Sequence, residues 1–145
     1  MLVRSKIENF LVLRFLKLHL TKGNKHTSER STAQSLSLIK KIKKTNPISV
    51  VHLSIQAVKP FCEIKSLKIG ASNYKVPTEI NPIRQRVLGI RFLISNSKKR
   101  NEKSLPQRIA MEIFDTIALS SQSLKSCDDL HKTAEANKVY IQYRN

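Results

Sequence analysis

Apolar residues recur every three or four positions along most of the chain, which is the spacing of one helix face. The segments with this spacing predict about six helices: Leu2–Leu20, Ser28–Ile42, Asn46 to Pro60, Asn81 to about Lys98, one from Ser104, and one from Ser126 to the C-terminus. Their predicted buried faces include Ile48, Val51, Ile55, Val58, then Ile83, Val87, Ile90, Ile94, then Ile109, Ile113, Phe114 and Ile117.

The predicted helix starts carry polar residues that can accept hydrogen bonds from free backbone N–H groups. Asn46 and Asn81 each precede a proline, which suits the first helical position. Ser28 is predicted to cap the second helix. The pairs Ser104 with Gln107 and Ser126 with Asp129 have the spacing of a capping box.

Two segments alternate between apolar and polar residues instead, as half-buried strands do. They are Phe61–Ile69 and Ser72–Ile80, with Gly70-Ala71 as the turn between them. The fold class predicted is therefore mainly α, a bundle of about six helices with a protruding two-stranded β-ribbon at about residues 61–80. The length of 145 residues favours one domain, 1–145.

Charge indicates the kind of partner. The chain has a formal net charge of +17 and a pI of about 10.3. Residues 1–60 hold 12 Lys+Arg against 2 Asp+Glu, and residues 61–145 hold 15 against 8, so the excess is spread along the whole chain. Such a charge repels itself unless a polyanion neutralises it, and its spread favours a protein embedded in nucleic acid.

Basic residues concentrate after the predicted ribbon. Arg84, Arg91 and Lys98 are seven residues apart, so they return to nearly the same face of a helix. The segment Lys98–Lys103 adds a basic loop, and Arg108 lies one turn into the next helix. A basic ribbon joined to a basic helix predicts contacts with nucleic-acid phosphates.

Catalytic chemistry is not expected. The acidic residues are scattered, and no nucleophile elbow, phosphate loop or His-Glu-x-x-His motif occurs. Cys127 and His131 are one helical turn apart, but no second pair completes a metal site. Cys62 and Cys127 do not form a disulfide framework, which favours a reducing compartment. We expect no enzyme activity, no cofactor, no metal and no membrane partner; the most apolar run, Phe10–Leu20, is short and interrupted by charges.

Three segments carry a resemblance to a known family. KPFCEIKSLKIGASNYKVPTEINPIRQRVLGIRF (residues 59–92) resembles the ribbon and following helix of the small-subunit ribosomal protein seven family. KKRNEKSLPQR (98–108) is similar to the loop of that family, and DDLHKTAEANKVYIQYR (128–144) to its last helix, with the segment AEANK the most specific piece. The likeness runs from about Val58 to Arg144 and is weaker before Val58.

The resemblance implies a structural protein of the small ribosomal subunit that binds the 3′ major (head) domain of the ribosomal RNA and organises head assembly. Its implied partners are that RNA, neighbouring head ribosomal proteins, and transfer RNA of the exit site and messenger RNA near the ribbon. The RNA-binding residues it implies are Lys65, Lys68, Lys75, Arg84, Arg86, Arg91, Lys98, Lys99, Arg100, Lys103, Arg108, His131, Lys132, Asn137, Lys138 and Arg144.

The chain also departs from the family pattern. A paired arginine is Arg84-Gln85 here, and Lys-Lys-Arg before the last helix is Lys125-Ser126-Cys127. The basic N-terminal arm and the C-terminal extension of bacterial members are expected to be missing. The chain has 18 Lys against 9 Arg, a bias typical of A+T-rich genomes. Together with the expected absence of the two terminal segments, this bias predicts a location in a mitochondrial ribosome, with a plastid or the bacterial cytoplasm as alternatives.

Two other functions fit part of the sequence. Ser28–Ile55 could form the helix-turn-helix of a DNA-binding regulator, but the charge spread over the whole chain disfavours it. A basic nuclease would need clustered carboxylates to hold metal ions, and the acids are not clustered.

Overall fold

The computed structural model describes residues 12–20 and 22–143, and within them helices dominate. A helical stretch at residues 12–19 is followed by α2 (Lys25–Lys43), α3 (Pro47–Val58), α4 (Pro82–Lys98), α5 (Leu105–Ile117), α6 (Gln122–Ala136) and a 3₁₀ helix, η1 (Lys138–Tyr143). Between α3 and α4, β1 (Cys62–Ile69) and β2 (Ser72–Glu79) pair antiparallel. The predicted fold class, a mainly α bundle with a two-stranded ribbon, is confirmed.

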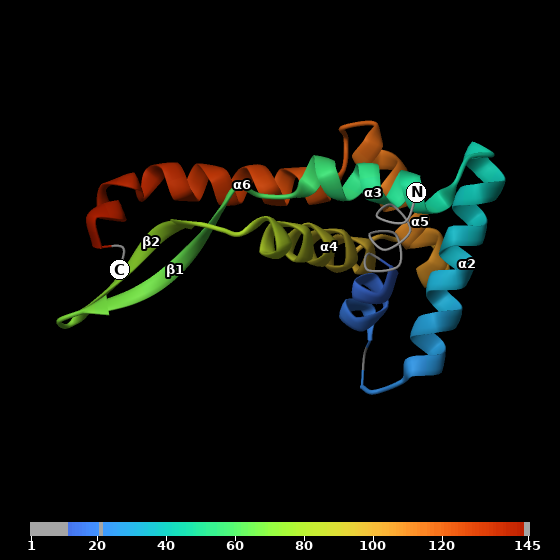
Figure 1. The fold of residues 1–145 in the computed structure, drawn as a ribbon, viewed down its shortest axis with the longest axis horizontal. Helices are drawn as coiled ribbons and strands as arrows, with labels where there is room; N and C mark the ends of the chain where they lie inside the picture. The colour runs from blue at the N-terminus through green and yellow to red at the C-terminus, as the bar shows by residue number, and fades with distance from the viewer. Residues whose placement is uncertain (1–11, 21, 144–145) are drawn as a thin grey trace.

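The ribbon protrudes from one end of the helical body (Figure 1). At the opposite end, α2 packs across α3 and α5. α4 and α6 run from this body toward the ribbon, and η1 contacts β2. The ribbon is thus supported on one side by the end of α6 and by η1, and it is joined directly to the start of α4.

The core lies where α2, α3, α4 and α5 meet. Each contributes at least one nearly inaccessible side chain, namely Ile39, Ile55, Val58, Ile90, Ile109 and Ile113. Burying each of these contributes roughly 1.5–3 kcal/mol to the free energy of unfolding. The predicted faces of α3 and α5 are largely confirmed. On α4 the prediction is wrong for Ile83, which is 54% exposed because the first turn of α4 lies beyond the bundle, beside the ribbon.

Two of the predicted helix starts are confirmed in detail. The side-chain oxygens of Asn46 and Asn81 accept hydrogen bonds from the N–H groups of Ile48 and Ile83, at 3.0 and 3.1 Å, with proline in the first turn. α5 begins after Ser104 as predicted, but the Ser104 side chain makes no capping hydrogen bond. Most of the predicted first helix, up to residue 11, lies outside the described residues.

The predicted start of α2 at Ser28 is wrong. The helix begins three residues earlier, after Asn24, and Ser28 lies inside it, 5% exposed. The Ser28 hydroxyl donates to the backbone oxygen of Leu16 at 3.1 Å. Ser28 therefore ties α2 to the preceding helical stretch instead of capping its own helix.

The predicted bounds of the last helix are also wrong. α6 starts at Gln122, where the Ser121 hydroxyl accepts a hydrogen bond from the Leu124 N–H. The Ser126 hydroxyl instead donates to the backbone oxygen of Gln122, so the Ser126–Asp129 pair lies inside the helix. The α-helix ends at Ala136, and the chain continues as η1, so the expected uninterrupted helix to the C-terminus is not found.

The ribbon matches its prediction to within one residue at each end. Cys62 pairs with Glu79 and Ile69 with Ser72, which leaves the two-residue turn Gly70-Ala71. Gly70 has a φ of +61° and Ala71 does not share the positive φ, the pattern of a turn with glycine at its first central position.

Candidate nucleic-acid interface

A basic surface runs along the exposed side of α4 and into the loop after it. Arg91 and Lys98 are exposed on α4, and Lys99 and Lys103 are exposed on the loop. We call these four residues the α4 basic surface. A helix holds Arg91 and Lys98 at fixed spacing, so less side-chain and backbone entropy is lost on binding than for cations on a flexible tail.

Arg84 has the same heptad spacing but a different environment. Its guanidinium binds both carboxylate oxygens of Glu63, with Nε–Oε2 at 3.0 Å and Nη2–Oε1 at 2.9 Å. The hydrogen bond from Arg84, aided by charge from Arg84, Lys65 and Arg91, lowers the pKa of Glu63 although burial opposes this. Arg84 thus joins the first turn of α4 to the base of β1, and part of its charge is neutralised within the protein. Arg86, on the same turn, is half-buried.

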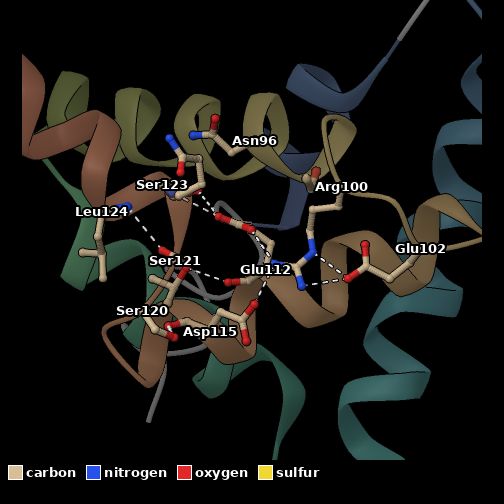
Figure 2. Close-up of polar contacts among 12 residues, drawn as sticks. Asn96, Arg100, Glu102, Glu112, Asp115, Ser120, Ser121, Ser123 and Leu124 are labelled. Carbon is tan, nitrogen blue, oxygen red and sulfur yellow. Dashed lines mark hydrogen bonds and ion pairs between the residues drawn. The ribbon is translucent and has the colours of Figure 1, made fainter.

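Arg100 is bound by three carboxylates inside the fold (Figure 2). Its guanidinium contacts Glu102 at 2.7 Å, Glu112 at 2.9 Å and Asp115 at 2.6 Å. These contacts, led by the hydrogen bond to Glu102, raise the pKa of Arg100 despite partial burial. Arg100 therefore has little free charge for phosphate, and its predicted RNA contact stays a prediction.

Glu112 connects this cluster to α6. Its side chain is 1% exposed, and Oε1 accepts hydrogen bonds from the N–H of Ser123 at 3.1 Å and from the Ser123 hydroxyl at 2.6 Å. Its other oxygen binds Arg100. The carboxylate sits at the first turn of α6, where unpaired N–H groups favour a negative charge. Arg100, Glu112 and Ser123 together join the loop, α5 and α6.

Arg108 holds the same loop from its other end. Its Nε donates to the backbone oxygen of Glu102 at 2.6 Å, and its Nη1 reaches that of Lys98 at 3.5 Å. With Arg100 bound at the other side, the loop backbone is fixed from within. The internal arginines thus brace the loop, while Lys99 and Lys103 project outward from it.

The ribbon lysines do not share one face. Strand pairing places Ser66 opposite Lys75 and Lys68 opposite Asn73, so Lys68 and Lys75 lie on one face. Lys65 is opposite Val76, on the other face. All three lysines are exposed, so the ribbon presents cations on both faces.

The predicted residues of the last helix differ in role. His131 accepts a hydrogen bond from the Phe61 N–H at 3.2 Å and stacks on the Phe61 ring, so it fastens α6 to the start of the ribbon. Asn137 donates to the backbone oxygen of Thr133 at 2.7 Å, at the end of α6. Lys132 and Lys138 are exposed, and Lys138 belongs to η1 instead of α6. Arg144 lies outside the described residues.

Other chemistry has little support in the described part of the chain. No three His, Cys, Asp or Glu side chains gather there into a group that could hold a metal ion. Burial, with the nearby charges of Asp128 and Cys62, raises the pKa of Cys127 to about 11, so its thiol is protonated at neutral pH. No helix among these residues combines the length and apolar character that spanning a bilayer requires.

Sequence reasoning missed the internal acids Glu63 and Glu112. One signal for Glu112 was present: it lies three residues after Ile109 and four before Thr116, on the buried face of α5. An acid at such a position needs a buried partner. The partner, Arg100, lies twelve residues earlier and was interpreted only as a surface cation.

The chain is similar in sequence to known proteins. A family model described as ribosomal protein S7p/S5e matches residues 1–138. The chain is 37% identical over 139 residues to small ribosomal subunit protein uS7 of Syntrophus aciditrophicus, covering 96% of this chain and 89% of that protein. It is 36% identical over 140 residues to the protein of the same name from Magnetococcus marinus (97% and 90%) and 34% over 139 residues to that of Dichelobacter nodosus (96% and 89%).

Proposed function

The chain belongs to the ribosomal protein S7p/S5e family, and from this premise we propose that it binds the 3′ major domain of small-subunit ribosomal RNA and organises assembly of the subunit head. As a family member it is a structural component of the small ribosomal subunit and not an enzyme. Membership of this family also argues against the two alternative functions, a DNA-binding regulator and a nuclease.

The observation that carries the proposal is the α4 basic surface, Arg91, Lys98, Lys99 and Lys103, held by a rigid helix and a braced loop. Folded RNA is recognised mostly through the shape of its backbone and its 2′-hydroxyls, and a rigid array of cations suits that target. Each phosphate neutralised releases a condensed counterion. Because Arg84 and Arg100 are paired with carboxylates within the protein, these four residues are the exposed cations that α4 and its loop offer to phosphate.

The ribbon is proposed to reach toward exit-site transfer RNA and the messenger path. Support comes from its protrusion beyond the helical body and from exposed lysines on both faces (Figure 1). For location we propose a mitochondrial ribosome, supported by the excess of Lys over Arg. The relatives named above are bacterial, and the bacterial cytoplasm is the alternative. Identifying whether a mitochondrial or a bacterial genome encodes the chain would decide between these two locations.

Sedimentation of an epitope-tagged chain tests the proposal. In a high-salt gradient the chain is expected to migrate with small ribosomal subunits, because many buried phosphate contacts form together. Migration as free protein, or with DNA, in the same gradient would contradict the proposed function.

A further inference from the structure

An apolar groove lies between the C-terminal end of α2 and α5. The helix α2 is in the part of the body opposite the ribbon (Figure 1). The groove is lined by Ile42, Lys43, Met111, Phe114, Asp115, Ile117 and Ala118. Ile42 is 59% exposed and Met111 is 39% exposed. In a chain with a net charge of +17, a contiguous group of exposed apolar side chains indicates an interaction surface of another kind.

Leu119 directly follows this groove and has an unfavourable backbone conformation. Its φ is +60°, while its side chain is 75% exposed. The N–H groups of Leu119 and Ser120 bond the backbone oxygens of Thr116 and Asp115, at 3.1 and 2.9 Å. This is the helix end at which glycine is usual, because other residues are strained there. A leucine at this position gains no burial in the described chain to offset the strain.

The charge around the groove is positive. Lys43 lines it, and Lys40, Lys41 and Lys44 are exposed on the same end of α2. The structure records no ion pair for these lysines among the described residues. The one acid in the lining, Asp115, is already bound to Arg100. An occupant with negative charge is therefore favoured.

The apolar lining decides between RNA and protein as that occupant. Phosphates could satisfy the lysines, but they would leave Ile42, Met111 and Leu119 in water. Bases stack on flat side chains, and the one aromatic residue in the lining, Phe114, is half-buried. A polypeptide can supply both carboxylates for the rim and apolar side chains for the groove.

We propose that the α2/α5 groove and Leu119 dock an acidic segment with apolar side chains from a neighbouring protein of the small subunit. That the neighbour is a subunit protein rests on the proposed function. The strain at Leu119 is then explained, because the leucine is retained for an intermolecular contact and not for folding.

Photocrosslinking in assembled subunits tests this docking. Benzoylphenylalanine replaces Met111, and illuminated small subunits are analysed for adducts. The expected product joins the chain to another protein through a peptide rich in Asp and Glu. The matched control carries the same probe at Leu53, which is 55% exposed on α3 and outside the groove, and this adduct should be absent.

Two variants of the Met111 probe and one control variant sharpen the test. Lys41→Glu with Lys43→Glu should lower the adduct yield roughly tenfold, because attraction becomes repulsion. Leu119→Gly should lower the yield at least several-fold, while the isolated protein unfolds at the same or a higher denaturant concentration. Leu53→Ala should change neither the yield nor the stability appreciably.

The inference is overturned by an adduct to RNA, by no adduct, by a peptide without acidic excess, or by an unchanged yield in Leu119→Gly. It is also overturned if Leu119→Gly destabilises the isolated protein as a core change would. In each of these outcomes the chain is still found in small ribosomal subunits. If the proposed function itself were wrong, the chain would not enter subunits at all, so the two failures can be distinguished.

Discussion

Arg100→Met should destabilise the protein more than any substitution on the α4 basic surface. Methionine keeps most of the side-chain length but removes the cation that Glu102, Glu112 and Asp115 share. Glu102 and Asp115 are 28% and 35% exposed and can be rehydrated. Glu112 is only 1% exposed and cannot be rehydrated, so its carboxylate keeps only the hydrogen bonds from Ser123.

The expected loss follows from that single buried carboxylate. Removing one member of a buried ion pair costs about 3–5 kcal/mol, and the Ser123 bonds and the partial exposure of Arg100 place the value at the lower end, about 3 kcal/mol. For a chain of this size each kcal/mol shifts the midpoint of thermal unfolding by roughly 2–4 °C, so a shift of about 6–12 °C is expected.

Urea and thermal unfolding followed by far-ultraviolet circular dichroism measure this loss. Lys99→Met, one residue earlier but exposed, is the matched control and should stay within about 0.5 kcal/mol. Arg100→Lys should be intermediate, because one ammonium cannot reach three carboxylates in the geometry of a guanidinium. A loss below about 1 kcal/mol for Arg100→Met would refute the view that this cluster braces the loop.

Three further outcomes are expected. Replacing Lys65, Lys68 and Lys75 together by Ala should leave the helical circular dichroism and subunit entry intact but impair translation by those subunits; failure to enter subunits would mean that the ribbon is an assembly contact. Because Arg84 lowers the pKa of Glu63, the ion pair stabilises the fold near neutral pH, and this stabilisation is lost as the pH falls below about 4.5. Arg84→Met should therefore flatten the acid side of a curve of unfolding free energy against pH. An unchanged acid side would contradict the pairing. Binding to head-domain RNA should weaken steeply with salt in a filter-binding series, with a log–log slope of several units at roughly 0.7–0.9 per phosphate contact, whereas a slope near zero would exclude counterion release.

Local signals in the sequence were sufficient for much of the fold. Asn46 and Asn81 before proline, and the alternation around Gly70, depend on neighbouring residues alone, and the structure agrees with them. Ser28 and Ser126 carried equally good local signals for helix starts. They failed because other partners, the Leu16 oxygen and the preceding turn of α6, use these hydroxyls instead.

The site was predictable only in part, because here too the partners of some residues are distant in the sequence. Exposed cations such as Arg91 and Lys99 follow from composition and helical spacing. Whether an arginine is free depends on acids distant in the chain, as with Arg84 and Glu63, which are 21 residues apart. Counting charges along the sequence cannot distinguish a bound guanidinium from a free one.

Arg84 is consequently unsuited to a charge-reversal test of RNA binding. Arg84→Glu would place two carboxylates together at the base of the ribbon and disturb its orientation, so a loss of binding would be ambiguous. Arg91 and Lys98 are exposed on the same helix and allow a cleaner reversal.

Chemical footprinting of small-subunit ribosomal RNA with purified protein tests the central claim most directly. The wild-type chain is predicted to protect nucleotides within the 3′ major domain, and Arg91→Glu with Lys98→Glu should abolish that protection while helical circular dichroism persists. The matched reversal Lys40→Glu with Lys41→Glu should retain it. If the α4 reversal still protected the head RNA while the α2 reversal did not, the RNA anchor would lie on α2, which would contradict its assignment to the α4 basic surface.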